Sequence, residues 1–173
     1  NILNPAQALI KGLADDGGLF VPYALDVKFN AKHFTDKKYA EIARVILEQY
    51  FSDSGIDIAK CTQSAYGSNN FYTDEPVKLA YVDDKIFLEL FHGKTAAFKD
   101  MALSILPHLM KDAVKAEKVD KKILILTATS GDTGKSALEA FKDIDSIDIV
   151  VFYPSQGVSA VQKRHMQSQK GSN

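Results

Sequence analysis

The sequence predicts an α/β fold, and the pattern behind this prediction lies in its last third. Residues 123–127 and 149–153 are continuous apolar runs with the length of a buried strand. Between them lie a tight loop, residues 130–134, and a helical stretch over residues 133–141. Strand, loop, helix and strand form a βαβ unit, whose two strands are parallel. A helical and hairpin segment is expected to precede this parallel sheet.

The amino-terminal part of the chain predicts a short helix and then an ordered loop. Residues 5–11 favour a helix, and residues 12–22 form a glycine-rich stretch that ends at Pro22. We expect a structured loop rather than a linker, because its apolar side chains need burial. They are Leu13, Leu19, Phe20 and Val21.

Two further helices are predicted before residue 70. Apolar residues recur at three- and four-residue spacing over residues 37–51, which indicates a helix with one apolar face. Thr35 or Asp36 would cap its amino end. A shorter helical stretch covers residues 53–66, and a polar loop follows it.

The middle of the chain predicts a β-hairpin. Apolar and polar residues alternate over residues 77–82 and 86–91, on either side of Asp83-Asp84-Lys85. The second strand would deliver His92 to a loop.

A broken helix is expected after the hairpin. Apolar residues between 98 and 118 lie on one helical stripe, but Pro107 predicts a kink or a break. Lys99 would lie in the first turn of this helix. A last helix is expected to start near Ser159. So small a parallel sheet would leave apolar faces uncovered, and we therefore expect the chain to be part of something longer.

Composition argues against several classes of function. The net charge of −1 leaves no strong field to attract nucleic acid or an anionic membrane. Cys61 has no second cysteine to pair with, and the histidines lack paired metal-ligand spacing, so we assign no metal site. The sequence shows neither a signal-peptide pattern nor a membrane-spanning run of about 20 apolar residues, and we expect a cytoplasmic protein.

The loop after the first parallel strand is a candidate ligand site. Ligands of such sheets bind at the carboxyl ends of strands, and free N–H groups at a helix start favour a carboxylate or a phosphate. The candidate residues are Thr129, Ser130, Gly131, Asp132 and Thr133. The alternative is that Ser130, Asp132 and Thr133 only cap the helix.

A nucleotide-binding interpretation of this loop is a minor alternative. The segment from Gly131 to Ser136 resembles the phosphate loop of nucleotide hydrolases, G-x-x-x-x-G-K-[ST]. Thr129 stands where that motif requires its first glycine, so the loop is too short to wrap a triphosphate in the usual way.

Lys99 is the second candidate. It lies beside apolar residues, Ala96 to Phe98, at a helix start whose dipole opposes a positive charge and so favours the neutral amine. A neutral lysine amine attacks aldehydes, which suits imine chemistry. Most lysines are nevertheless solvated surface cations, and periodicity alone does not separate Lys99 from Lys94 or Lys111.

Four segments in register resemble threonine synthases. The two signature segments are Phe91-His-Gly-Lys-Thr-Ala-Ala-Phe-Lys-Asp100 and Ala128-Thr-Ser-Gly-Asp-Thr-Gly134. The glycine-rich residues 12–22 and the segment 152–159, followed by Gln162 and Met166, agree as well. Lys94 is a departure, because the family usually has proline there.

This resemblance implies a fold of the tryptophan-synthase β type, with pyridoxal phosphate as cofactor. Residues 1–75 would be a mostly helical amino-terminal segment, and residues 76–173 the first part of the catalytic α/β domain. The implied reaction converts O-phospho-L-homoserine and water to L-threonine and phosphate. The implied partners are the small-molecule substrate and the remainder of the same chain, without nucleic acid or membrane.

The resemblance also implies residue roles. Lys99 would form a Schiff base with pyridoxal phosphate and then act as acid and base. Residues 129–133 would hold the substrate carboxylate, and Asp132 would also approach the cofactor. His92 and Thr95 would be active-site neighbours, while the residues that bind the cofactor's phosphate would lie beyond Asn173. We therefore expect this chain to be inactive alone.

Two other functions remain open at this point. One is another pyridoxal-phosphate lyase of the same fold type, such as a dehydratase or a cysteate synthase, which would share the lysine and the S-G-x-T-G loop. The other is a noncatalytic binding module.

Overall fold

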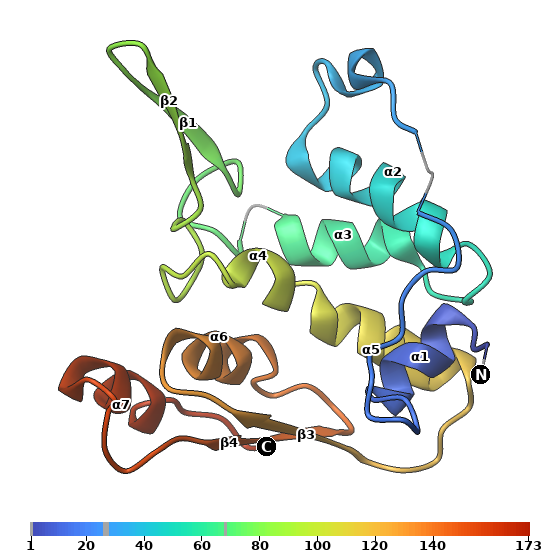
Figure 1. The fold of residues 1–173 in the computed structure, drawn as a ribbon, viewed down its shortest axis with the longest axis vertical. Coiled ribbons are helices and arrows are strands. Elements are labelled where there is room, and N and C mark those ends of the chain that lie inside the picture. The colour runs from blue at the N-terminus through green and yellow to red at the C-terminus, as the bar shows by residue number, and fades with distance from the viewer. Residues whose placement is uncertain (1, 26–27, 68) are drawn as a thin grey trace. The chain divides into compact units, whose positions relative to one another are not determined.

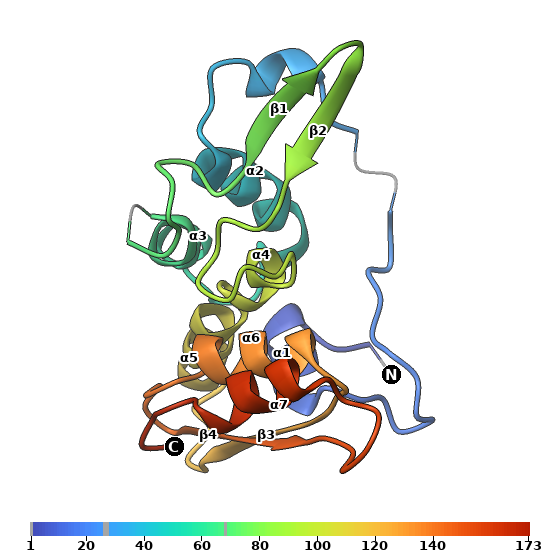
Figure 2. The same ribbon diagram turned by 90° about the vertical axis from the view of Figure 1, so that its left-hand side faces the viewer.

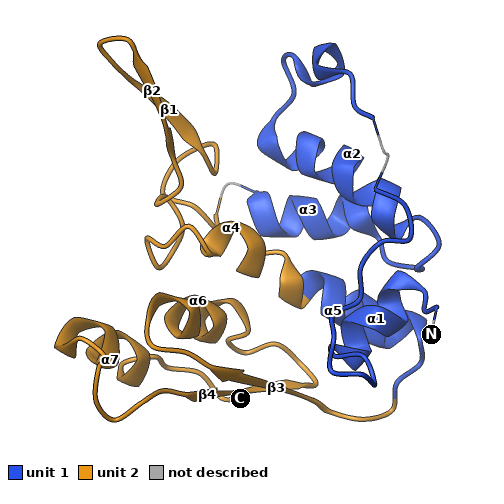
Figure 3. Ribbon diagram, viewed as in Figure 1, with its two compact units in different colours: residues 1–67, 108–119 blue, residues 68–107, 120–173 orange. Residues whose placement is uncertain are grey.

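The computed structural model describes residues 2–25, 28–67 and 69–173, in which helices alternate with two small sheets (Figure 1). The chain divides into two compact units (Figure 3). Unit 1 comprises residues 1–67 and 108–119, and unit 2 comprises residues 68–107 and 120–173. Within the described ranges, no helix is long and apolar enough to cross a membrane.

Unit 1 is helical, as the sequence predicts. Helix α1, Pro5–Lys11, begins with a capping box in which Asn4 and Gln7 exchange side-chain hydrogen bonds with each other's backbone. A short 3₁₀ helix, η1, covers Ala31–Phe34, and α2 covers Tyr39–Phe51. Helix α3, Ile58–Tyr66, packs beside α2. Residues 108–119, which include most of α5, complete the unit.

The predicted starts of α2 and α3 are wrong by a few residues. Neither Thr35 nor Asp36 caps α2, because Asp36 has a left-handed φ of 67° and lies outside the helix. The backbone N–H of Lys38 instead donates to the Glu41 carboxylate at 2.9 Å. Helix α3 begins only after Asp57, whose carboxylate accepts a hydrogen bond from the Lys60 backbone at 3.0 Å.

The glycine-rich loop is ordered, but the predicted burial of its apolar side chains is wrong. Backbone hydrogen bonds from Ala14 to Gly18 and from Gly17 to Ala14 close a tight turn. Leu13, Leu19 and Val21 are nonetheless 61–77% exposed. The loop from Leu19 to Ala24 forms one wall of an open groove whose other walls are α1 and the end of α2. Leu19 and Val21 therefore line this open groove rather than a closed core, and Leu13 is exposed without lining it.

Cys61 lies in the core of unit 1 and is 2% exposed. Burial, reinforced by the negative charge of Asp112, raises the pKa of the Cys61 thiol to about 12. The thiol Sγ lies 3.7 Å from the Asp112 carboxylate. This environment favours a structural thiol over a reactive one.

We expect Cys61 to resist alkylation at pH 8 until the protein unfolds. A pKa raised by about three units lowers the thiolate fraction by roughly 10³-fold relative to an exposed cysteine. The folded state holds the thiol proton more tightly than the unfolded state does. The protonated thiol therefore contributes to the free energy of unfolding in full below the ordinary thiol pKa, and this contribution is lost as the pH rises toward 12. Iodoacetamide labelling with and without urea measures the difference. Equal rates in the two conditions would contradict the burial.

Unit 2 begins with the predicted hairpin. Strands β1, Lys78–Val82, and β2, Lys85–Glu89, pair antiparallel with Val82 opposite Lys85. The turn is therefore the two residues Asp83 and Asp84, of which Asp83 has a left-handed φ of 53° that aspartate tolerates. Lys85 belongs to the strand rather than to the turn.

Pro107 breaks the following helix, as predicted. Helix α4 covers Asp100–Leu103, and α5 covers Leu106–Ala116. Proline has no N–H to donate to the carbonyl four residues earlier, so the helix cannot continue through Leu103. Pro107 instead lies in the first turn of α5, where the missing donor costs little.

The predicted βαβ unit is confirmed in the last third of the chain. Strand β3, Ile123–Ala128, pairs in parallel with β4, Ile147–Phe152. Between them, α6 covers Asp132–Ala140, and after β4 comes α7, Ala160–Gln167. Both helices cover the same face of the sheet (Figure 2). Ser159 caps α7, where the sequence predicts a new helix.

The opposite face of this sheet is open, as expected for so few strands. Alternate side chains of β3 and β4 lie on it and are 40–62% exposed: Leu124, Leu126, Val150 and Phe152. Their alternating partners face the helices, where Ile147 and Ile149 of β4 are buried. The sheet is thus half covered, with its core between β4, α6 and α7.

Candidate active site

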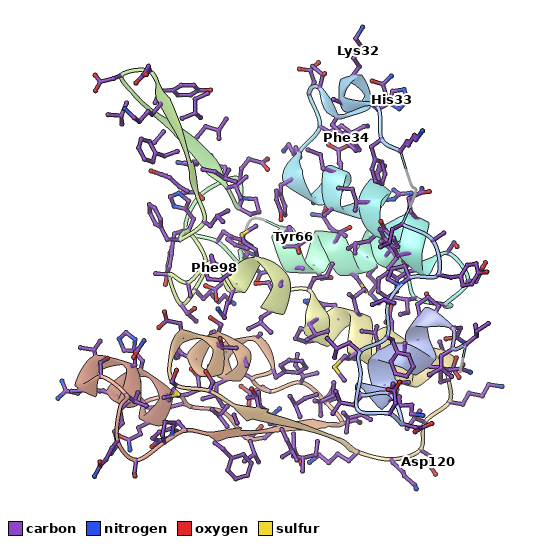
Figure 4. All side chains as sticks on the ribbon, in the orientation of Figure 1. Lys32, His33, Phe34, Tyr66, Phe98 and Asp120 are labelled. Carbon is purple, nitrogen blue, oxygen red and sulfur yellow. The ribbon has the colours of Figure 1, made fainter. Side chains whose placement is uncertain are left out.

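Lys99 occupies the N-cap position of α4, one residue before the first helical turn in which it was expected. Its carbonyl oxygen accepts the backbone N–H of Leu103 at 2.9 Å, which fixes the lysine backbone to the helix. The Nζ atom lies 4.1 Å from the centre of the Phe98 ring, which is a cation–π contact. Phe98 lies at the amino end of α4 (Figure 4). The side chain is half-buried and ends at an exposed aromatic ring.

The loop before Lys99 folds around a buried carboxylate. Asp100 is 5% exposed. Its Oδ2 accepts the backbone N–H of Thr95 at 2.8 Å, and its Oδ1 accepts the Thr95 hydroxyl at 2.6 Å. A Cβ on Gly93 would lie 2.4 Å from the same carboxylate, so only glycine fits there. The turn from Gly93 to Asp100 is therefore closed by the residue next to Lys99.

Thr95 also connects this loop to α6. Its Oγ1 lies 2.8 Å from the Oγ of Ser136, which is 1% exposed. Helix α4 packs beside α6 within unit 2. The lysine segment and the helix that follows the 129–133 loop are thus held together by packing and by a buried hydroxyl pair.

The 129–133 loop lies at the carboxyl end of β3, as predicted. The Thr129 N–H donates to the Phe152 carbonyl at 2.9 Å, and the Gly131 N–H donates to the Thr129 hydroxyl at 3.3 Å. Helix α6 then begins at Asp132, with Gly131 as its N-cap residue. Ser130 is exposed, whereas Thr133 is partly covered. The arrangement places the amino end of a helix beside a strand end, where an anion is favoured.

Gln162 of α7 closes the loop from the other side. Its Nε2 donates to Asp132 Oδ1 at 3.2 Å. A Cβ on Gly131 would lie 2.5 Å from that same Nε2 atom, so the glycine permits the close approach. The three residues line a cavity of about 10 Å³, large enough for one water molecule, together with Thr95, Lys135 and His165. Thr95 and the loop therefore share one cavity.

We expect Gly131→Ala to separate Gln162 from Asp132 and to loosen the loop. The added methyl meets the end of a flexible side chain, so the cost to folding is about 1 kcal/mol, the lower end of the range for overpacking. Thermal unfolding measures this change.

The matched control is the double variant Gly131→Ala with Gln162→Ala, in which the space for the methyl is restored. Its thermal stability should exceed that of Gly131→Ala alone. A larger loss in the double variant would contradict the steric explanation.

Lys135 is engaged within unit 2. Its Nζ donates to Gln169 Oε1 and lies 3.9 Å from Glu139 Oε2. Gln169 in turn donates to Glu139 at 2.9 Å. In a nucleotide phosphate loop the corresponding lysine reaches the phosphates. The observed contacts favour a structural lysine and weaken the nucleotide-hydrolase alternative.

His92 is a packed and hydrogen-bonded residue. Its Nε2 lies 2.7 Å from Glu89 Oε2 at the end of β2, with the imidazole side chain 13% exposed. Its carbonyl accepts the Tyr72 N–H at 2.8 Å. His92 does not line the cavity that Thr95 shares with the loop. A role for His92 beside bound ligand stays a prediction.

Three contributors were not identified from the sequence. Asp100 stands inside the lysine segment but was not singled out, because a carboxylate next to lysine usually faces solvent. Ser136 and Gln162 come from helices that follow the loop, and only their positions in space reveal their contacts. Across the residues that the structure describes, no group of three or more histidine, cysteine or acidic residues could hold a metal ion.

Comparisons with known proteins agree with the resemblance in the sequence. Residues 2–66 match the family model described as threonine synthase N terminus. Threonine synthase of Pseudomonas aeruginosa is 37% identical over 177 residues, which cover 99% of this chain and 37% of that protein. Threonine synthase-like 1 of Homo sapiens is 35% identical over 170 residues, which cover 91% of this chain and 22% of that protein.

Solved structures give the same result. The chain superposes on the pyridoxal-phosphate-bound threonine synthase of Brucella melitensis with a TM-score of 0.82 and 35% identity, covering 96% of this chain and 36% of that one. Yeast threonine synthase gives a TM-score of 0.79 at 31% identity, covering 93% of this chain and 35% of that one. The chain therefore spans about a third of the length of these solved structures. The fold, the matched amino-terminal segment and the identity over nearly all of this chain together show that it resembles the first third of threonine synthases.

Proposed function

We propose that the full-length protein is a threonine synthase, which converts O-phospho-L-homoserine and water to L-threonine and phosphate with pyridoxal phosphate as cofactor. One observation supports this most strongly. The lysine segment is joined to α6, the helix that follows the 129–133 loop, through the hydrogen bond between Thr95 and Ser136, and Thr95 lines one cavity with Gly131 and Asp132 of the loop. A lysine and an anion-binding loop are the two parts that amino-acid chemistry on this cofactor requires.

The residues present fit part of such a cofactor site. Lys99 offers an amine on a fixed backbone, and its Nζ lies over the exposed ring of Phe98. The loop offers hydroxyl groups and the amino end of α6. Pyridoxal phosphate, when bound, supplies an electron sink for the substrate carbons. The residues that bind its phosphate are predicted to lie beyond Asn173.

Each candidate residue has a defined task in this proposal. Lys99 binds the cofactor aldehyde and afterwards takes and returns protons at the substrate carbons through Nζ. Ser130 and Thr133 donate hydroxyl hydrogen bonds, and the backbone at Thr129 and Gly131 holds the loop that faces the substrate carboxylate. Asp132, oriented by Gln162, approaches the cofactor.

The domain division and the cellular location are part of the proposal. Residues 1–75 serve as the amino-terminal segment, and residues 76–173 begin the catalytic domain of a cytoplasmic enzyme. In this proposal residues 1–173 alone are inactive, because the residues that would bind the phosphate group of the cofactor are predicted to lie beyond Asn173. Addition of the cofactor to residues 1–173 should therefore give no threonine.

A substrate comparison tests the proposed function. The full-length protein with pyridoxal phosphate should release threonine and phosphate in equal amounts from O-phospho-L-homoserine. L-serine, L-threonine and O-phospho-L-serine serve as competing substrates, because a dehydratase or a cysteate synthase would prefer one of them. Preference for a competitor would replace the proposal by another lyase, and binding without turnover would support a noncatalytic module.

A further inference from the structure

Asp100 is a buried carboxylate to which the proposed reaction assigns no task. It is 5% exposed, and both of its oxygens accept hydrogen bonds from Thr95. Burial of a carboxylate is costly unless hydrogen bonds compensate it. Closing the loop does not by itself require a buried charge, because an uncharged polar side chain could accept the same backbone N–H.

The hydrogen bonds around Asp100 have a defined direction. An ionised carboxylate can only accept, so the Thr95 hydroxyl must donate to Oδ1. Because the hydroxyl proton of Thr95 is already donated to Asp100, the Ser136 hydroxyl must donate to Thr95 Oγ1, which lies 2.8 Å from Ser136 Oγ. A chain of donors therefore runs from Ser136 on α6 through Thr95 to Asp100.

This series of hydrogen bonds ends at Asp100, directly beside the lysine. Asp100 follows Lys99 in the sequence, and its own N–H donates to the Ala97 carbonyl at 3.0 Å. The carboxylate thereby holds the loop before Lys99, and the backbone N–H of the same residue closes the turn around the lysine. Gly93 lets the start of the loop pass close to the carboxylate.

We propose that Asp100 is a positioning residue, which fixes Lys99 relative to α6 through the hydrogen bonds that join Asp100, Thr95 and Ser136. This inference rests on the proposed function, since it concerns the lysine that would carry the cofactor. Misplacement of a reacting group by about 1 Å costs on the order of 100-fold in rate. These hydrogen bonds contribute to the reaction by holding the lysine in place, and in this proposal Asp100 itself touches neither substrate nor cofactor.

Variants of Thr95 in the full-length enzyme test the chain with the least disturbance. Thr95→Val removes the hydroxyl and keeps the shape, whereas Thr95→Ser keeps the hydroxyl. We expect Thr95→Val and Asp100→Asn to lower kcat by about 10- to 100-fold with KM changed less than about 3-fold. Thr95→Ser should retain kcat within about 3-fold. Asp120→Asn, at an exposed position of unit 2 (Figure 4), is the control for the loss of a carboxylate.

Two readouts besides activity separate positioning from mere stability. Hydrogen exchange of residues 93–99 in the enzyme without cofactor should become faster in Thr95→Val and stay slow in Thr95→Ser. The circular dichroism of the visible absorption band reports the orientation of the bound cofactor. This signal should weaken in Thr95→Val and stay unchanged in Thr95→Ser. If Asp100→Asn does not fold, the Thr95 pair carries the test.

The outcomes distinguish this inference from the proposed function. Unchanged kcat and dichroism in Thr95→Val would overturn the positioning role, and so would an equal loss in Thr95→Ser. Absence of threonine formation in the unaltered full-length enzyme would instead overturn the proposed function, and the positioning of its lysine would fall with it. Loss in Thr95→Val, rescue in Thr95→Ser and a working unaltered enzyme support both.

Discussion

Lys99→Ala is expected to lower threonine formation by the full-length enzyme by at least about 10³-fold. Under the proposed function the variant removes both the amine that would hold the cofactor and the acid and base that would serve the substrate carbons, and proton transfer alone accounts for about 10²- to 10⁴-fold. Folding should be unaffected, because the side chain is only half-buried and its described contact is with the exposed ring of Phe98. Steady-state kinetics and thermal unfolding measure the two effects separately.

Lys94→Ala is the matched control for this prediction. Lys94 lies in the same loop, carries the same charge and is exposed. Its removal should change the rate less than about 3-fold, since a solvated surface charge contributes little. A Lys99→Ala enzyme that keeps a tenth of the activity, or a Lys94→Ala enzyme that loses as much, would show that the wrong lysine has been assigned.

Gly134→Ala is expected to destabilise the full-length protein by about 1–3 kcal/mol, the usual range for overpacking of a core. The added Cβ would lie 2.5 Å from Thr129 Cγ2, 2.9 Å from Val151 Cγ1 and 3.0 Å from Met166 Sδ. Three elements meet there, so no single side chain can move away. Helix propensity alone predicts the opposite sign, because alanine is favoured over glycine in helices. Thermal or urea-induced unfolding measures the change.

Gly171→Ala is the control for Gly134→Ala in the same unit. The nearest atom to its added Cβ would be Lys142 Cγ at 3.4 Å, an ordinary contact with a flexible side chain. Its stability should change by less than about 0.5 kcal/mol. A neutral or stabilising Gly134→Ala would contradict the tight junction of β3, β4, α6 and α7 around the loop.

Local patterns in the sequence identified most of the fold. The alternation around Asp83-Asp84 and the effect of Pro107 are local, and both predictions are confirmed. The predicted burial of Leu13, Leu19 and Val21 is wrong, because burial depends on what lies opposite a side chain, and the groove that Leu19 and Val21 line is open. Helix starts were misjudged where a nearby carboxylate, such as that of Asp57, competes for the cap.

The candidate site was only partly accessible from the sequence. Lys99 and the loop at Ser130 stand in segments whose residue types indicate chemistry, and family resemblance made them specific. The residues that position them could not be found in this way. Asp100 is 36 residues from Ser136 in the chain. The Thr95 hydroxyl joins them only because α4 packs beside α6 in the folded structure.

Reductive labelling tests the central claim most directly. The full-length protein would be incubated with pyridoxal phosphate, reduced with borohydride, digested and mapped by peptide mass spectrometry, with residues 1–173 treated in parallel. The account predicts pyridoxyl label confined to Lys99 in the full-length protein and weak or missing label in residues 1–173. Label spread over exposed lysines such as Lys94, or no label in the full-length protein, would contradict it.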